Sequence, residues 1–276
     1  MRLALFLTLL HACSSLRFQP APWSRARISL PRVIAAIVAP VISGIIGVHA
    51  SAASDNVPVY FGVGCFWHVQ HEFVEAEKSI LGRSNKELTA LAGYAGGRNN
   101  DKVCYHNLQG VADYGSLGHG EVVSLNIPSD KVGDFAREYF KLFDARGDRP
   151  DKLDLGLEYR SLLGLPGGAS SSYYKAVEDA ATEKGIKLVA GKGGDSDTLG
   201  KNMVWVMDTE KFPFYRAEVY HQFHGKNLRK FLRLCISIFV DGFMPGEQYP
   251  QEYNSIRDEK MGDGSLKSTG CPEKLF

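Results

Sequence analysis

The sequence lacks any pair of cysteines in a C-x-x-C arrangement, although it contains five cysteines among its 276 residues. This absence argues against a zinc ribbon and against a thioredoxin-like redox motif. A scaffold held together by disulfides is also disfavoured, because a chain of this length with 44% hydrophobic residues can bury a core of its own. The cysteines therefore predict one or two reactive thiols among inert ones.

An excess of charge of either sign is absent too. The chain contains 32 basic and 31 acidic residues, which gives a formal net charge of +1. This balance gives no argument for an acidic substrate, and we expect no nucleic-acid partner.

Acidic residues are missing from the first 54 residues, where five arginines carry all of the formal charge. Two apolar stretches, at residues 3–10 and 33–48, occupy this segment, and the small-x-small triplet Ala50-Ser51-Ala52 follows the second. Such a pattern resembles a multipartite plastid leader. We therefore expect residues 1–54 to be a targeting leader that is removed. Residues 55–276 would then form the mature domain in a plastid, with the thylakoid lumen among its destinations.

A secretory signal or a membrane anchor at residues 33–48 is the alternative. That stretch has about 16 apolar residues, whereas a helix needs roughly 20 to span a bilayer, and Pro40 interrupts it. We expect no stable membrane insertion after the leader has been removed.

Hydrophobic patterning after the leader predicts strands and helices mixed without a regular βαβ repeat. Strands are expected at 57–63, 88–93, 121–127, 159–165, 186–189 and 203–207, and helices at 66–77, 129–143 and 170–184. Ser129 is expected to cap the second helix. We predict an α+β fold, a two-layer sandwich with a ferredoxin-like mixed sheet, helices and long loops.

Cys65 lies between the first predicted strand and the first predicted helix. The backbone N–H groups and the positive end of the helix dipole at such a position favour the nucleophilic thiolate. Position alone does not establish reactivity, because a cysteine there is more often an inert apolar side chain. A metal site is a further alternative, since Cys65, His68 and His71 have C-x₂-H-x₂-H spacing and His221 with His224 could complete it.

Five segments, in chain order, carry the motifs of one enzyme family. They are Gly64-Cys65-Phe66-Trp67, Gly93-Tyr94-Ala95-Gly96-Gly97, Gly118-His119-Gly120-Glu121, Asp154 with Tyr159-Arg160-Ser161, and Phe214-Tyr215 with His221-Gln222. Together they resemble the methionine sulfoxide reductase A family over residues 57–225. The resemblance is to a divergent subgroup, because His68, Gly120 and the pair Leu157-Glu158 stand where the family usually has Gly, Ala and Thr-Gln. Residues 55–276 are thus identified as a methionine sulfoxide reductase A-like catalytic domain with a C-terminal tail.

The resemblance implies a reaction that needs no metal and no cofactor. Cys65 would attack the sulfoxide sulfur and become a sulfenic acid. Glu121 would donate a proton to the departing oxygen, because a carboxyl in an apolar pocket has a raised pKa and stays protonated near neutrality.

Other residues are expected to bind the substrate. By resemblance, Tyr94 and Tyr159 would hold the sulfoxide oxygen, and Asp154 would belong to the same polar network. Phe66 and Trp67 would form the apolar seat of the S-methyl group. A seat that distinguishes methyl from oxygen can select one epimer, and the family acts on the S epimer.

A second cysteine is expected to resolve the sulfenic acid and to form a disulfide that thioredoxin reduces. Cys271 is the preferred candidate, because it lies in a Gly- and Ser-rich tail that could swing over the site. Cys235 and Cys104 are the alternatives. Cys235 lies within residues 225–240, which we hypothesise to be an insert encoded by a retained intron; an amphipathic helix docked on the domain is the other interpretation.

The leading hypothesis is therefore a reductase of methionine S-sulfoxide, acting on oxidised proteins or on free methionine sulfoxide. A thiol-dependent peroxidase is an alternative, but it would need no methyl seat. A non-catalytic protein that binds a sulfoxide or a metal is a third hypothesis, and it would be expected to lack Cys65 or Glu121.

Overall fold

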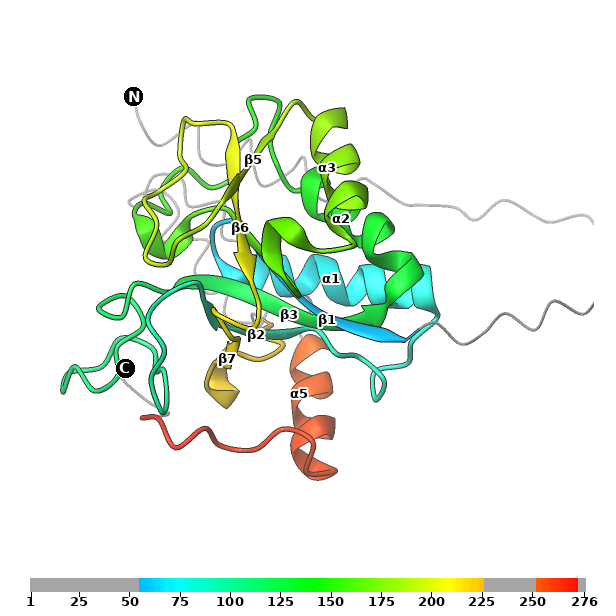
Figure 1. Ribbon diagram of the computed structural model, residues 1–276. Coiled ribbons are helices and arrows are strands. Elements are labelled where there is room, and N and C mark those ends of the chain that lie inside the picture. The colour runs from blue at the N-terminus through cyan, green and yellow to red at the C-terminus, as the bar shows by residue number, and fades with distance from the viewer. Residues whose placement is uncertain (1–54, 226–251, 273–276) are drawn as a thin grey trace, which may run out of the picture. The chain divides into compact units, whose positions relative to one another are not determined.

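The computed structural model describes residues 55–225 and 252–272, which all belong to one compact unit (Figure 1). The expected leader, Cys235 and residues 226–240 of the expected insert lie outside the described residues. Among the helices that are described, none combines the length and the apolar character that crossing a membrane requires.

A ferredoxin-like βαββαβ unit forms the centre of the fold. Its elements are β1 (Asn56–Gly62), α1 (Phe66–Leu81), β2 (Leu91–Ala95), β3 (Gly120–Pro128), α2 (Val132–Lys141) and β4 (Leu162–Leu165). The four strands lie in the order β4-β1-β3-β2, and each is antiparallel to its neighbours. This strand order is that of a split βαβ arrangement, so the predicted α+β, ferredoxin-like fold is confirmed.

Three further strands widen the sheet to seven strands. At one edge β6 (Met203–Asp208) pairs in parallel with β4, and β5 (Lys187–Ala190) pairs in parallel with β6. At the other edge the short strand β7 (Tyr215–Arg216) pairs with β2. The sheet is therefore mixed, as the sequence predicts.

Side chains alternate between the two faces of the sheet, and the helices cover one of them. On β1, Val59 and Phe61 belong to the main core, whereas Tyr60 between them belongs to a small cluster on the opposite face. The ring of Phe61 lies 5.0 Å from that of Phe73 on α1 and 5.1 Å from that of Tyr139 on α2. The helix α3 (Tyr174–Glu183) contributes its buried residues to the same core.

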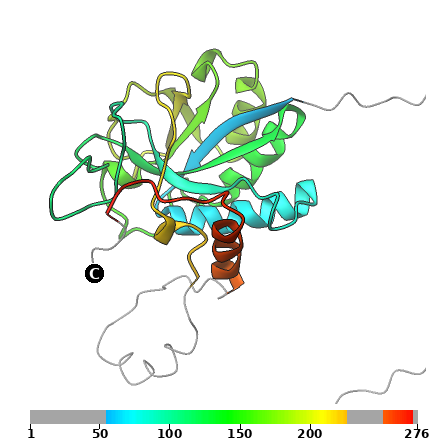
Figure 2. The same ribbon diagram turned by 90° about the horizontal axis from the view of Figure 1, so that it is seen from below.

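The C-terminal segment packs against α1 through the helix α5 (Glu252–Gly262), as Figure 2 shows. The ring of Tyr253 lies 4.6 Å from that of His71 on α1, and Lys260 donates a hydrogen bond to the carbonyl of Leu88 at 2.9 Å. The tail that follows α5 therefore starts from a fixed position beside α1.

The predicted elements are confirmed, but several of their ends are corrected. Helix α1 continues four residues beyond its predicted end and stops where Gly82 adopts the left-handed conformation at φ +67°. The predicted strand 159–165 begins only at Leu162, because Leu157–Tyr159 form the 3₁₀ turn η2. Ser129 makes no side-chain cap to α2; it begins a separate 3₁₀ turn, η1 (Ser129–Lys131).

Candidate active site

Cys65 occupies the N-cap of α1, directly after β1 and the turn at Gly64. Its extended backbone (φ −62°, ψ 126°) ends the strand and lets the helix begin at Phe66. Gly64 has φ +75°, and a Cβ there would lie 2.9 Å from Asp154 Oδ2, so this close approach requires glycine. The thiol of Cys65 is half-buried.

Two carboxyl groups cap the start of α1 beside this thiol. The N–H of Cys65 donates to Asp154 Oδ2, and the N–H of Phe66 donates to Glu121 Oε2, each at 2.9 Å. The helix N-terminus therefore does more than polarise Cys65, because it also fixes the two acidic side chains that the sequence predicts for the site.

Glu121 is the more deeply buried of these carboxyls and comes from β3. It is 2% exposed, and its Oε1 lies 3.2 Å from the hydroxyl of Tyr114. Burial raises the pKa of Glu121 to about 8 against the opposing hydrogen bond from the Phe66 N–H, and the charge of Asp154 adds to the rise. At neutral pH this carboxyl is mostly protonated, so it can donate a proton.

Tyr159 and Tyr105 are two half-buried tyrosines of the site. Burial raises the pKa of both hydroxyls well above the usual value, and the charges of Glu121 and Cys65 raise both further. Both therefore stay protonated and can donate hydrogen bonds. The sequence does not predict Tyr105, and the one local signal for it is its place next to Cys104.

Tyr94 is more deeply buried than Tyr105 and Tyr159. The side chain is fully buried, its hydroxyl donates to Glu218 Oε2 at 2.8 Å, and its ring stacks on that of Tyr114 at 4.6 Å. The proton of this hydroxyl is thus already engaged by a buried carboxylate. The structure thus places the Tyr94 hydroxyl against Glu218, whereas the side chain of Tyr105 is partly accessible.

Aromatic rings form a wall beside Cys65. The wall consists of Phe66, Trp67, Tyr105 and His221; the ring of His221 lies 5.1 Å from Phe66, 5.8 Å from Trp67 and 4.4 Å from Tyr105. Burial lowers the pKa of His221 to about 4, so this ring is neutral and suits an apolar surface. Phe66 and Trp67, the expected seat of the methyl group, thus lie together in this wall, and His221 is an additional member.

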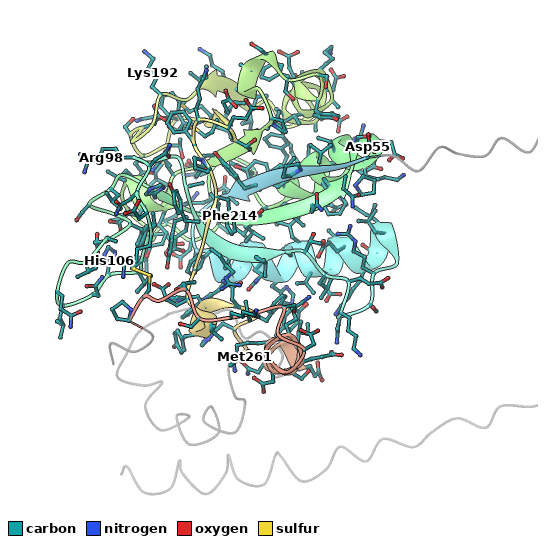
Figure 3. The ribbon with its side chains drawn as sticks, turned by 60° about the horizontal axis from the view of Figure 1, so that its bottom comes forward. Asp55, Arg98, His106, Lys192, Phe214 and Met261 are labelled. Atoms are coloured by element: carbon teal, nitrogen blue, oxygen red, sulfur yellow. A yellow bond between two sulfur atoms is a disulfide. The ribbon has the colours of Figure 1, made fainter. Side chains whose placement is uncertain are left out.

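Cys271 is not a thiol in a swinging tail, because it forms a disulfide with Cys104 across a Cα–Cα distance of 5.6 Å. Figure 3 shows this bond in yellow near the labelled His106. Glu218 lies with the two sulfurs in the one group of three metal-type donors found among the described residues. Two of those donors are joined to each other, and Cys65, His68 and His71 form no such group in this part of the chain.

Comparisons with known proteins identify the family of the chain. A sequence model described as peptide methionine sulfoxide reductase matches residues 58–244, which is more than half of the chain. A curated relative is peptide methionine sulfoxide reductase MsrA of Geobacter metallireducens, 26% identical over 168 residues that cover 59% of this chain and 85% of the relative.

Two solved structures are also similar. Methionine sulfoxide reductase A of Corynebacterium diphtheriae is 18% identical with a TM-score of 0.39, covering 70% of this chain and 79% of the other. Reduced Mxr1 from Saccharomyces cerevisiae is 19% identical with a TM-score of 0.40, and the match covers 71% of this chain and 92% of Mxr1. On the strength of the family match over residues 58–244, the chain belongs to the peptide methionine sulfoxide reductase family and is a peptide-methionine sulfoxide reductase.

Proposed function

We propose that the chain reduces methionine S-sulfoxide, protein-bound or free, by attack of Cys65 on the sulfoxide sulfur. The observation that carries this proposal is the buried carboxyl beside the nucleophile. Glu121 accepts the N–H of Phe66 at 2.9 Å, one residue after Cys65, and burial raises its pKa to about 8. The site thus combines a sulfur nucleophile with a group that holds a proton at neutral pH.

The reaction moves one proton and one oxygen. The Cys65 sulfur forms a bond to the sulfoxide sulfur as the proton of Glu121 moves to the sulfoxide oxygen. The hydroxyl then passes to the Cys65 sulfur, as the S–O bond of the substrate and the new bond between the two sulfurs both break. The products are the thioether, a Cys65 sulfenic acid and a Glu121 carboxylate.

The arrangement of the site explains why only one epimer should react. Tyr105 and Tyr159 donate hydrogen bonds to the sulfoxide oxygen, and the aromatic wall at Phe66 and Trp67 receives the methyl group. Once the positions of oxygen, methyl and attacking sulfur are fixed, only one hand of the sulfoxide places its remaining substituent toward solvent. The family resemblance assigns that hand to the S epimer.

The first prediction concerns epimer selectivity. The full chain, reduced with a chemical dithiol, should turn over the S epimer of methionine sulfoxide and leave the R epimer unchanged. Cys65→Ser should abolish turnover, because serine is too weak a nucleophile at neutral pH. Chiral chromatography of the residual substrate measures the consumption of each epimer by the wild-type chain and by Cys65→Ser. Equal consumption of the two epimers, or faster consumption of hydrogen peroxide, would contradict the proposal and favour a thiol peroxidase.

The second prediction concerns pH. The single-turnover rate of the reduced chain should fall as the pH rises through about 8, because Glu121 must be protonated to act and burial sets its pKa there. Glu121→Gln should lower the rate by at least about a hundredfold and remove this descending limb. Stopped-flow measurement of thiol loss records the rate. A wild-type rate that keeps rising above pH 8 would rule out Glu121 as the acid.

The third prediction separates two tyrosines. Tyr105→Phe should lower kcat/KM about a hundredfold, because it removes a donor to the developing negative oxygen. Tyr94→Phe should leave kcat/KM within a factor of about two and lower the free energy of unfolding by about 2 kcal/mol, because Glu218 loses a buried partner. Kinetics and urea unfolding of both variants provide the comparison, and the reverse pattern would restore Tyr94 to the substrate site.

We further propose that Cys271 resolves the sulfenic acid and that Cys104 completes the cycle. When both are reduced, the Cys271 thiol attacks Cys65 and releases water, and the Cys104 thiolate then attacks Cys271 and releases Cys65 as a thiolate. The Cys104–Cys271 bond supports this proposal, since it would be the final product. A dithiol protein of the thioredoxin type would reduce it.

The fourth prediction tests this recycling. Cys271→Ser should retain single turnover within about twofold, because the attack on the sulfoxide needs only Cys65. Steady-state turnover with thioredoxin as reductant should fall at least about tenfold, since no disulfide forms that thioredoxin can reduce. Unchanged turnover with thioredoxin would assign resolution to another thiol, with Cys235 as the next variant.

A further inference from the structure

A line of hydrogen-bonding groups connects Glu121 to the surface. The hydroxyl of Tyr114 lies 3.2 Å from Glu121 Oε1 and 3.5 Å from Glu158 Oε2. Glu158 Oε2 lies 3.2 Å from His106 Nε2, and His106 Nδ1 lies 2.7 Å from Asp113 Oδ2. We refer to Tyr114, Glu158 and His106 as the proton chain.

Exposure increases along the proton chain from its inner to its outer end. Tyr114 is 0% exposed, the side chain of Glu158 is 28% exposed and that of His106 is 46% exposed. His106 is labelled at the edge of the domain in Figure 3. Glu121 at the inner end is 2% exposed, so the proton chain connects a buried carboxyl group to solvent.

The fold holds these groups together from three separate segments. Tyr114 and His106 come from the loop 98–119, Glu158 from η2 and Glu121 from β3. Within the loop the N–H of Tyr114 donates to the carbonyl of Cys104 at 2.9 Å. Glu158 packs directly on Gly115, where a Cβ would lie 1.9 Å from its Oε1, so a side chain at 115 would displace Glu158.

We propose that His106, Glu158 and Tyr114 return a proton from solvent to Glu121 after each turnover. The proposal rests on the role of Glu121 proposed above, because a buried donor that has lost its proton must regain one before the next turnover. None of the three residues needs to touch substrate. They act through Glu121.

The transfer conserves charge and changes only N–H and O–H bonds. The His106 imidazolium gives a proton to Glu158, and His106 regains one from hydronium or a protonated buffer. Glu158 then donates to the oxygen of Tyr114 as Tyr114 passes its own proton to Glu121. Burial and the charge of Glu121 hold the pKa of Tyr114 far above its usual value, so the tyrosine must accept a proton as it gives one.

The charges around the outer end suit this role. Burial alone would lower the pKa of His106, but the hydrogen bond to Asp113 and the charge of Glu158 raise it above its usual value. The rings of Tyr105 and Tyr114 pack against His106 and carry no charge. At the inner end, Asp154 and Glu158 are the charged groups that raise the pKa of Glu121. Because the pKa of His106 is raised, its protonated imidazole is available near neutrality.

The same contacts could serve only to hold the loop 98–119, and the identity of residue 158 separates the two interpretations. The resembled family usually has glutamine there, which can make the hydrogen bonds of Glu158 but cannot carry a proton. Glu158→Gln is thus a matched variant that preserves the contacts and interrupts the transfer.

The test compares single and repeated turnover of the full chain on methionine S-sulfoxide with a saturating chemical dithiol. Glu158→Gln should keep the single-turnover rate of the reduced protein within about twofold. Its steady-state kcat should fall about tenfold and its solvent deuterium isotope effect should increase, because proton return becomes limiting. Asp101→Asn, an exposed carboxylate on the same loop, is the control and should change neither.

His106→Ala provides a second measurement. Imidazole buffer should restore kcat of this variant in proportion to the imidazolium concentration, which a residue that only holds the loop would not show. An unchanged kcat and isotope effect in Glu158→Gln, an equal loss in its single turnover, or no rescue of His106→Ala would each overturn the proton chain. Full single-turnover activity of Glu121→Gln would instead overturn the proposed function itself, so the two failures are distinguishable.

Discussion

The hydrogen bond between the N–H of Phe66 and the buried carboxyl of Glu121 joins the first helix to the third strand at the point where the chemistry takes place. Its geometry follows from the pairing of β1 with β3, in which Phe61 lies opposite Val123. Glu121, two residues before Val123 on β3, reaches the start of α1. Gly62 makes this approach possible, because a Cβ there would lie 2.2 Å from the Glu121 carbonyl.

A second constraint is the buried carboxyl group of Glu218, which binds the loop 98–119 to β2. Glu218 accepts the hydroxyl of Tyr94 at 2.8 Å and the N–H of Tyr105 at 2.7 Å. The disulfide between Cys104 and Cys271 fixes the same loop to the C-terminal tail across 167 residues of sequence. Tyr105, which we propose to hold the sulfoxide oxygen, is thus positioned by Glu218 and by the link between its loop and the C-terminal tail.

The sequence predicts those parts of the structure that have a local pattern of apolar residues or a local motif. The apolar run of β1, the alternation in β3 and the apolar stripe of α1 predict elements of the ferredoxin-like unit. The motif around Cys65 predicts the nucleophile, and the separate segment Gly118–Glu121 predicts the acid. The strand β7 has only two residues, which is too short to show an alternating pattern. The apolar residues of η2 run on into those of β4, so the sequence alone places the start of that strand too early.

Contacts between residues far apart in the sequence explain what could not be predicted within the site. The glycine-rich motif indicates Tyr94, but only three-dimensional packing reveals that its hydroxyl is engaged by Glu218. The tail of Cys271 has no local pattern that reports a partner at Cys104, because a disulfide depends on distance in space. The contact of His106 with Glu158 likewise joins two segments whose neighbourhood no spacing in the sequence predicts.

Glu121 should hold a proton at neutral pH beside Cys65, and the titration of this carboxyl can be observed directly. Infrared difference spectra of the full chain, recorded against Glu121→Gln over pH 4 to 10, isolate the C=O band of this protonated carboxyl. The account predicts that the band persists at pH 7 and disappears with a pKa of about 8. Loss of the band with a pKa near 4.5, the ordinary value for glutamate, would contradict it.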